Sequence, residues 1–446
     1  MDLSFGTDGV RGRIGTELDA ASVRGLGLAA AGHLGSARVV VGHDSRESGP
    51  DLLYALADGF VAGGVEVVSI GMAPTPAVAC LAALDSVAGA MVSASHNPWW
   101  DNGVKLFAAG GRKLGDATQA AIQEVWHLRP RLDPTGNFSV VDVDDGRWAD
   151  SVVGSAAPGV LTGMRLVVDC ANGATSLSAG GVLSKLGAQV TVIHDSPDGR
   201  NINEGCGSTR PEGLQDAVVS LGADAGLAFD GDGDRVVAVA ADGSLLDGDH
   251  LLAICAVDRL GRGLLTGSTV VVTVMANLGL RRGLTDHGIM VHETDVGDRN
   301  VLEALDNGGW SLGGEQSGHI VFPEFATTGD GLLTGVQVLD AVVRAGRTIG
   351  DMAAELVSRA PQVLESIPVS GSGAAVVAGV ADLIHEEADR LGSNGRVLVR
   401  PSGTEPVVRV MVEAVDAGTA EAVAERLCLA VRNADAGTEP GAATGS

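Results

Sequence analysis

Three aspartates at alternate positions form a group that could bind a metal ion. Asp230, Asp232 and Asp234 lie in the segment DGDGDR, between the apolar runs AGLAF and VVAVA. Carboxylates at this spacing can converge on one side of a loop and offer the hard oxygen ligands that Mg²⁺ prefers. Three like charges so close together repel one another unless a cation neutralises them. The segment therefore predicts a magnesium site, with a plain acidic turn as the alternative, and Arg235 could face a phosphate beside the metal.

The segment RPSGTEP could bind a phosphate group. Its serine, glycine and threonine supply hydroxyls and backbone N–H groups, the ingredients of an anion nest, and guanidinium groups beside them suit a phosphate. The candidate phosphate-binding residues are Arg400, Ser402, Gly403, Thr404 and Arg409. The alternative is a hairpin in which Arg409 forms a surface salt bridge with Glu405.

The segment GGEQSGH, residues 313–319, offers a carboxylate, an amide, a hydroxyl and an imidazole on one turn. Glu315, Ser317 and His319 could hydrogen-bond the hydroxyls of a sugar. The same groups suit an ordinary polar loop, and taken alone the segment favours that interpretation.

Ser95 lies directly beside His96 in the segment SASHNPWWDNGVKLF, which we expect to be an exposed loop. Adjacent residues of an extended chain point to opposite faces, so we expect His96 to be poorly placed to take a proton from Ser95. The segment has no G-x-S-x-G elbow, which argues against a serine hydrolase. Beside a metal loop and a phosphate loop, the serine fits a residue that carries a phosphoryl group. Lys105 is a candidate proton carrier for the accepting hydroxyl, with a surface lysine as the alternative.

The composition argues against several classes of function. The 446 residues carry a net charge of −26, which disfavours binding to nucleic acid or to an anionic membrane. The five cysteines are scattered and include no C-x-x-C pair, which favours a reducing cytosol over a disulfide framework. The sequence shows no signal peptide, membrane-spanning run or Walker motif. We therefore expect a cytoplasmic protein that does not transfer phosphate from a nucleotide.

A pattern of three β-rich segments with intervening helical segments occurs three times along the chain. The third segment of each copy ends in one of the loops described above. The copies comprise residues 37–46, 64–71 and 87–98, then 164–173, 187–195 and 224–235, then 268–277, 288–299 and 310–320. Such apolar strands separated by helices predict α/β units with parallel or mixed sheets. Because ligands bind beyond the carboxyl ends of strands in these folds, the three loops are the expected site.

The length and the changes of pattern predict several domains. We expect α/β domains at residues 1–157, 158–250 and 251–361, and a smaller α+β domain at residues 362–433. Residues 434–446 are rich in Gly, Ala and Thr and have no apolar period, so they are expected to be disordered.

These motifs together resemble the α-D-phosphohexomutase superfamily, and most closely the bacterial phosphoglucosamine mutases. The matching stretches are FGTDGVRG, VGHDSRESG, SASHNP with DNGVKLF, DGDGDR, GGEQSGH and RPSGTEP, in family order from Phe5 to Pro406. The resemblance implies an α/β fold with three similar α/β domains that have mixed sheets, and a smaller C-terminal α+β domain, around a central cleft.

The resemblance also implies roles for individual residues. Ser95 would be the phosphorylated residue and would hold one Mg²⁺ together with Asp230, Asp232 and Asp234. The implied catalytic residues are Ser95, Lys105, Arg11 and His96. The implied substrate-binding residues are Glu315, Ser317, His319, Arg235, Arg400, Ser402, Gly403, Thr404 and Arg409, of which the last five would contact the phosphate that does not react.

The activity implied by the resemblance is the interconversion of glucosamine 6-phosphate and glucosamine 1-phosphate. The phosphoserine would give its phosphoryl group to the sugar phosphate and form glucosamine 1,6-bisphosphate, which would turn around and return its other phosphoryl group. The product would supply UDP-N-acetylglucosamine for the cell wall. The expected partner is a small phosphosugar, with neither nucleic acid nor membrane, and a homodimer is left open.

Three alternatives stay open. A phosphomannomutase/phosphoglucomutase is the nearest, and Gln316 favours the glucosamine branch by likeness alone. A phosphatase would use Asp230 as its nucleophile and would leave RPSGTEP unexplained, while a non-catalytic phosphosugar-binding protein would have little use for three carboxylates. Two departures from the family pattern, the pair Trp99–Trp100 and Asn300, put loop packing in doubt but not the chemistry.

Overall fold

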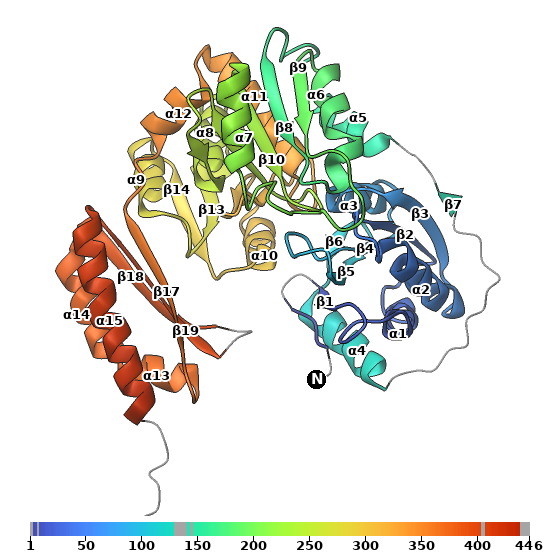
Figure 1. Cartoon of the computed structure of the whole chain (residues 1–446), viewed down its shortest axis with the longest axis horizontal. Coiled ribbons are helices and arrows are strands. Elements are labelled where there is room, and N and C mark those ends of the chain that lie inside the picture. The colour runs from blue at the N-terminus through green and yellow to red at the C-terminus, as the bar shows by residue number, and fades with distance from the viewer. Residues whose placement is uncertain (1–2, 7–8, 129–140, 143–145, 403–405, 438–446) are drawn as a thin grey trace, which may run out of the picture. The chain divides into compact units, whose positions relative to one another are not determined.

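The computed structural model describes residues 3–6, 9–128, 141–142, 146–402 and 406–437 (Figure 1). The chain divides into two compact units. The large unit comprises Met1–Ala276 and Leu284–Leu356, and the C-terminal unit comprises Asn277–Gly283 and Val357–Ser446. Each unit is described by itself.

The first sheet of the large unit has seven strands, with the order β1-β5-β4-β2-β3-β7 and β6 paired to β5. The strands are β1 (Val10–Arg13), β2 (Arg38–His43), β3 (Glu66–Met72), β4 (Ala88–Val92), β5 (Asp101–Ala108), β6 (Arg112–Lys113) and β7 (Val141–Asp142). The accompanying helices are α1 (Ala20–Ala31), α2 (Gly49–Ala62), α3 (Thr75–Leu84) and α4 (Asp116–His127). Helices α1 and α2 pack closely because Gly27 lies against the backbone of Leu56, where a Cβ atom would collide with the carbonyl oxygen.

The second sheet has the order β12-β11-β10-β8-β9. Its strands are β8 (Arg165–Asp169), β9 (Gln189–Ile193), β10 (Ala225–Phe229), β11 (Val236–Ala240) and β12 (Leu245–Leu246). The helices of this region are α5 (Arg147–Gly154), η1 (Ala174–Leu177), α6 (Ala179–Lys185) and α7 (Glu212–Leu221).

The third sheet has the order β14-β13-β15-β16. Its strands are β13 (Thr269–Thr273), β14 (Met290–Thr294), β15 (Gly313–Gly314) and β16 (Ile320–Val321). The helices of this part of the chain are α8 (Gly248–Gly261), η2 (Thr266–Ser268), α10 (Asp298–Gly308), α11 (Gly331–Ala345) and α12 (Ile349–Leu356), whereas most of α9 (Leu278–Asp286) belongs to the C-terminal unit.

The same topology occurs in all three sheets. In each, the first strand of the repeat (β2, β8 or β13) pairs in parallel with the next two strands, and the third strand of the repeat (β4, β10 or β15) pairs antiparallel with the strand that follows it (β5, β11 or β16). Every residue of β4 and β10 is buried, as expected for strands covered on both faces. This confirms the expected threefold α/β pattern with mixed sheets, and it places one loop after each of β4, β10 and β15.

The C-terminal unit contains one antiparallel sheet with the order β17-β19-β18. The strands are β17 (Gln362–Pro368), β18 (Gly395–Pro401) and β19 (Val407–Ala414), and the helices are α13 (Gly373–Gly379), α14 (Ala381–Leu391), η3 (Gly392–Asn394) and α15 (Ala417–Gly437). Alternate residues of β19, Val408, Val410 and Val412, are buried in the core of this unit, so the residues between them face the other side. Figure 1 shows the helices on one face of the sheet.

Helix α15 differs from the expectation for the C-terminal tail. It continues through Gly437, so residues 434–437 are helical, whereas disorder was expected from residue 434. The helix can continue there because Asp435 accepts hydrogen bonds from the backbone and side chain of Ser370. Residues 438–446 lie outside the described part of the chain.

Two further features bear on the class of protein. None of the five cysteines, all within the described residues, forms a disulfide. Among the described residues, no helix combines the length and the apolar character that a membrane crossing requires.

Candidate active site

The loops that follow β4, β10 and β15 meet in the large unit. The Ser95 hydroxyl donates a 2.6 Å hydrogen bond to Asp230 Oδ2, although 135 positions separate the two residues in the chain. Nδ1 of His319 lies 3.7 Å from Asp234 Oδ2. The structure therefore brings together residues from all three copies of the repeated pattern, where the sequence placed them.

The expectation for His96 was wrong. Ser95 has a φ of 52°, in the left-handed region, so the chain is not extended there and the two side chains do not point apart. Ser95 Oγ lies 3.3 Å from His96 Nδ1. Burial, together with the charges of Arg235 and Arg11, lowers the pKa of His96 from 6.5 to about 4, so its imidazole is neutral at neutral pH.

The loop of Ser95 is also buried rather than exposed, and residues that the sequence reasoning missed hold it in place. Ser95 itself is 0% exposed. The buried guanidinium of Arg46 donates to the carbonyl oxygens of Ser95 (2.8 Å) and Asn97 (2.9 Å), and Asp44 pairs with it at 2.8 Å. Asn203 donates a further 3.0 Å bond to the Ser95 carbonyl. These bonds stabilise a left-handed conformation that would otherwise cost about 1–3 kcal/mol. Arg46 lies in the segment VGHDSRESG, which the sequence analysis identified only as one of the stretches that resemble the family.

The three aspartates form a compact, buried cluster. One ligand oxygen of each lies within 4.8 Å of the others. Lys105 Nζ is 2.7 Å from Asp232 Oδ2 and 3.0 Å from Asp234 Oδ2, and the Thr75 hydroxyl donates to Asp232 Oδ2 at 2.5 Å. Oδ1 of Asp232 and Oδ1 of Asp234 are buried and accept no hydrogen bond within the described residues. These two oxygens fit a hard cation, which needs oxygen ligands rather than donors.

The charges within this cluster are unevenly neutralised. Burial, then the charges of Asp234 and Asp232, raises the pKa of Asp230 well above its usual range. Burial would raise the pKa of Asp234 as well, but the charges and hydrogen bonds of Lys105 and His319 hold it well below that range. An additional cation would favour the charged form of all three carboxylates. The cluster is therefore suited to a divalent metal ion.

The remaining predicted residues of the large unit surround this cluster. Glu315 accepts a 3.2 Å bond from the Gly297 N–H, and Ser317 Oγ lies 3.5 Å from Glu315 Oε2. His319 is 2% exposed and accepts the Gly329 N–H at Nε2, so its ring proton lies on Nδ1, towards Asp234. Arg235 donates its backbone N–H to Asp230 Oδ1 at 3.3 Å. Arg11 is half-buried in β1, opposite Gly103 of β5.

The C-terminal unit places two predicted arginines side by side. Arg400 of β18 pairs directly with Arg409 of β19, so both side chains lie on the same face of the sheet. A phosphate can accept bidentate hydrogen bonds from guanidinium groups placed in this way. The Ser402 N–H donates to the Val407 carbonyl at 2.9 Å and begins the turn. Gly403, Thr404 and Glu405 lie outside the described residues.

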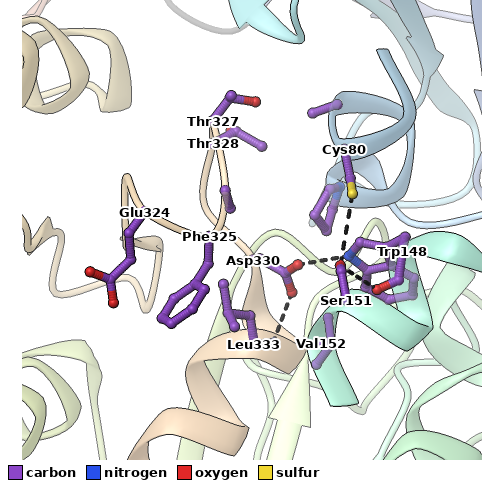
Figure 2. A pocket seen from close by; sticks show the side chains of 13 residues that line it. Cys80, Trp148, Ser151, Val152, Glu324, Phe325, Thr327, Thr328, Asp330 and Leu333 are labelled. Atoms are coloured by element: carbon purple, nitrogen blue, oxygen red, sulfur yellow. Dashed lines mark hydrogen bonds between the residues drawn. The ribbon is translucent and has the colours of Figure 1, made fainter. Parts of the chain in front are cut away.

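A cavity of about 210 Å³ lies between α3, α5 and the start of α11 (Figure 2). Asp330 lies in its wall and accepts hydrogen bonds from Trp148 Nε1 at 2.8 Å and from the Leu333 N–H at 2.9 Å. The next residue, Gly331, donates its N–H to the carbonyl of Gly233 at 3.0 Å. Asp330 therefore joins α5 to the end of α11 that supports the metal loop.

The Trp148 indole should report the titration of Asp330. Burial raises the pKa of Asp330 from 3.8 to about 6, because the charged form is poorly solvated there. The indole N–H donates to this carboxyl group, so its NMR resonance should shift with a midpoint near pH 6. Trp148→Phe assigns the resonance, and Asp330→Asn should abolish the shift. A resonance that stays constant between pH 5 and 7.5 in the wild type would contradict the raised pKa.

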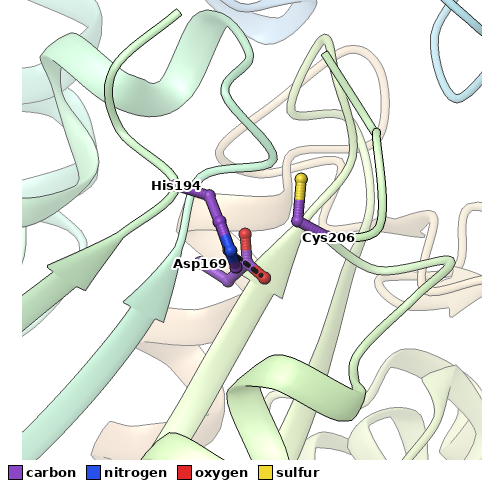
Figure 3. Close-up of side chains that lie close together, drawn as sticks. All are labelled: Asp169, His194 and Cys206. Atoms are coloured by element: carbon purple, nitrogen blue, oxygen red, sulfur yellow. Dashed lines mark ion pairs between the residues drawn. The ribbon is translucent and has the colours of Figure 1, made fainter. Parts of the chain in front are cut away.

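A second cluster of possible metal ligands lies near the ends of β8 and β9 (Figure 3). Asp169 lies 3.0 Å from Nδ1 of His194, and its two oxygens accept the N–H groups of Ala171 (2.8 Å) and Gly207 (2.9 Å). Burial, followed by the charge of Asp169, raises the pKa of the Cys206 thiol to about 12, so the thiol stays protonated. We assign this cluster a structural role, because its carboxylate is already used to join two loops.

Comparisons with known proteins agree with this arrangement. The chain matches the four phosphoglucomutase/phosphomannomutase family profiles: α/β/α domain I at residues 2–128, domain II at 151–243, domain III at 247–360 and the C-terminal domain at 366–430. Phosphoglucosamine mutase of Rhodococcus opacus (strain B4) is 48% identical over 441 residues, covering 96% of this chain and 98% of the relative. That of Thermobifida fusca (strain YX) is 48% identical and covers 97% and 99%.

Solved structures show the same fold. A phosphoglucomutase/phosphomannomutase family protein from Burkholderia thailandensis has a TM-score of 0.83 at 29% identity, covering 99% of both chains. N-acetylphosphoglucosamine mutase of Aspergillus fumigatus, solved with GlcNAc-6P and magnesium, has a TM-score of 0.68 at 19% identity and covers 98% of this chain and 96% of that one. With four family domains in order and relatives that match over nearly their whole length, the chain belongs to the phosphoglucomutase/phosphomannomutase family, alongside the phosphoglucosamine mutases.

Proposed function

We propose that this protein is a mutase that interconverts glucosamine 6-phosphate and glucosamine 1-phosphate. The observation that carries the proposal is the 2.6 Å contact between Ser95 Oγ and Asp230, within a cluster of three buried carboxylates. A phosphoryl carrier needs this combination, because a phosphorylated serine requires a cation on its oxygens rather than a neighbouring base. The identity of 48% to phosphoglucosamine mutases supports the choice of sugar.

The carboxylate cluster fits Mg²⁺. Asp230, Asp232 and Asp234, with the phosphoryl group of Ser95, would hold one ion. The Oδ1 atoms of Asp232 and Asp234, which accept no hydrogen bond within the described residues, support this assignment. When bound, the ion would neutralise negative charge on the transferred phosphoryl group. Lys105 lies between two of the same carboxylates, with its Nζ 2.7 Å from Asp232 Oδ2 and 3.0 Å from Asp234 Oδ2.

The reaction then uses Ser95 twice. A sugar hydroxyl attacks the phosphorus atom, the bond from phosphorus to Ser95 Oγ breaks, and the proton of the attacking hydroxyl ends on Ser95. In the return step Ser95 Oγ attacks the bisphosphate, and the sugar oxygen leaves with a proton. Asp230 Oδ2 accepts the Ser95 hydroxyl, so it is placed to hold the serine proton during that attack. We propose that Lys105 carries the proton to and from the sugar hydroxyl. Arg11 and His96 are proposed as further catalytic residues.

Sugar and phosphate recognition are assigned to the remaining residues. The residues proposed to contact the sugar are Glu315, Ser317 and His319, with Arg235 near the reacting phosphate. The residues proposed to bind the phosphate that does not react are Arg400, Ser402, Gly403, Thr404 and Arg409. The direct pairing of Arg400 and Arg409 supports an anion there, since a phosphate can accept bidentate bonds from guanidinium groups.

Steady-state kinetics on three substrates test the proposed sugar. We expect the highest kcat/KM for glucosamine 6-phosphate and lower values for glucose and mannose 6-phosphate. The reactions are measured with Mg²⁺ and a catalytic amount of hexose bisphosphate, so that every assay begins with the phosphorylated enzyme. An equal or higher efficiency with either hexose phosphate would instead support a phosphomannomutase/phosphoglucomutase.

Replacement of Arg409 tests the phosphate-binding role of the C-terminal unit. Arg409→Ala should raise KM and also lower kcat, because contacts to a remote group fix the geometry of the reacting one. A charge-assisted contact contributes about 1.5–3 kcal/mol, so kcat/KM should fall roughly ten- to hundredfold. Arg390→Ala is the matched control, since Arg390 is exposed on α14 and pairs with Glu386. Unchanged constants in Arg409→Ala would mean that the loop is structural.

A further inference from the structure

Gln316 is anchored by the residues that begin α8. Its side-chain Nε2 donates to Asp247 Oδ2 at 3.3 Å, and its backbone carbonyl accepts the Gly248 N–H at 3.0 Å. Gly248 lies so close that a Cβ atom there would collide with the carbonyl oxygen of Glu315. The start of α8 therefore holds the loop that carries Glu315 and Ser317 through both the backbone and one side chain.

The carboxylate of Asp247 is used in an unusual way. An aspartate at the N-cap normally accepts a backbone N–H of its own helix. Asp247 occupies the N-cap of α8, but its side chain makes no such bond. Its Oδ1 instead lies 2.7 Å from Nδ1 of His250, and both residues are only 9% exposed. Because a carboxylate only accepts, His250 must carry its proton on Nδ1 and thereby fixes the position of Asp247.

The same reasoning fixes the orientation of the Gln316 amide. The amide end that contacts Asp247 must be the NH₂ group, since an amide oxygen facing a carboxylate would be repelled. The amide oxygen, which is bonded to the same carbon atom as the NH₂ group, is then directed away from the Asp247 carboxylate. An oxygen acceptor in a fixed position suits an ammonium group, which can only donate, and a charge-assisted bond to it is stronger than one to a neutral hydroxyl.

We propose that the Asp247–His250 pair positions Gln316 so that its amide oxygen receives the amino group of the substrate, which makes Asp247 and His250 determinants of sugar specificity. This inference rests on the proposed function, because it requires an amino sugar. Neither residue is catalytic; both act through Gln316.

Two substitutions and their combination test the inference. Asp247→Ala and Gln316→Met should each lower kcat/KM for glucosamine 6-phosphate about tenfold, the effect of one hydrogen bond. The value of kcat/KM for glucose 6-phosphate, which is expected to be low in the wild type, should change less than twofold. The specificity ratio, which is kcat/KM for glucosamine 6-phosphate divided by that for glucose 6-phosphate, should therefore fall about tenfold in each variant. The double variant should be no worse than either single one, because both remove the same contact. His250→Ala should lower the ratio, and His250→Asn, which retains a donor near the Nδ1 position, should restore it.

The controls separate positioning from loss of structure. Asp19→Ala removes a different N-cap aspartate, which accepts the Ser22 N–H, and should leave the ratio unchanged. Equal losses for all sugars in Asp247→Ala, or additive losses in the double variant, would overturn the inference while the proposed function stands. Failure of the proposed function is seen separately, in the wild type, as a preference for a hexose phosphate.

Discussion

Ser95→Ala should lose mutase turnover by at least ~1000-fold, equivalent to ~4 kcal/mol of barrier, while the protein still folds. The substitution removes the oxygen that carries the phosphoryl group. The left-handed backbone of residue 95 costs alanine about as much as serine, and the bonds from Arg46 and Asn203 go to the backbone carbonyl, which the substitution leaves in place. Turnover is measured with excess enzyme, and thermal unfolding by circular dichroism checks the fold.

A serine of no proposed role provides the matched control. Ser151 lies on α5, where its hydroxyl donates to the Trp148 carbonyl at 2.7 Å. Ser151→Ala should turn over at the wild-type rate. Substantial turnover by Ser95→Ala would contradict the phosphoserine mechanism and would favour an aspartyl phosphate on Asp230.

Asp232→Asn should weaken Mg²⁺ binding and activity together. The substitution keeps the size of the side chain and an oxygen for the Thr75 hydroxyl, but it removes one negative charge from the cluster. We expect a loss of about a hundredfold at limiting Mg²⁺, equivalent to about 3 kcal/mol of barrier. Activity is titrated against Mg²⁺, and metal affinity is measured directly by calorimetry.

Chelation of the wild type gives the complementary result. Excess chelator should abolish turnover, and added Mg²⁺ should restore it. Asp242→Asn is the control, because Asp242 lies in an exposed turn where it accepts from Ser244. Full activity in excess chelator would rule out the metal role of the cluster.

The convergence of the three loops was predictable from the sequence. Strands β4 and β10 are apolar at every position, which indicates strands covered on both faces. Because ligands bind beyond the carboxyl ends of such strands, Ser95 and Asp230 were expected in one site. Their 2.6 Å contact bears this out. The sheet order follows from the same repeat, since each copy supplies strands in the same sequence.

The local geometry of Ser95 was not predictable, because contacts from distant parts of the chain impose it. Arg46 and Asn203 bond the Ser95 carbonyl from 49 and 108 positions away and hold a left-handed conformation that no local rule assigns to a serine. The argument about His96 assumed an extended chain and failed for this reason.

The residues that contact Lys105 and Gln316 could not be predicted from the sequence either. Lys105 meets Asp234 across 129 positions, and Gln316 meets Asp247 across 69. Sequence patterns identify which residue types could act, but which of them form a pair is decided by how the loops meet.

Mass spectrometry of the Ser95 peptide tests the central claim most directly. Purified wild-type protein is incubated with glucose 1,6-bisphosphate, freed of ligand, digested and analysed with and without hydroxylamine, which cleaves an acyl phosphate but not a phosphoserine. We predict phosphate on Ser95 that survives hydroxylamine and is lost when glucosamine 6-phosphate is added before digestion. Phosphate on Asp230 that hydroxylamine removes, or an active enzyme with no phosphate on Ser95, would contradict the account.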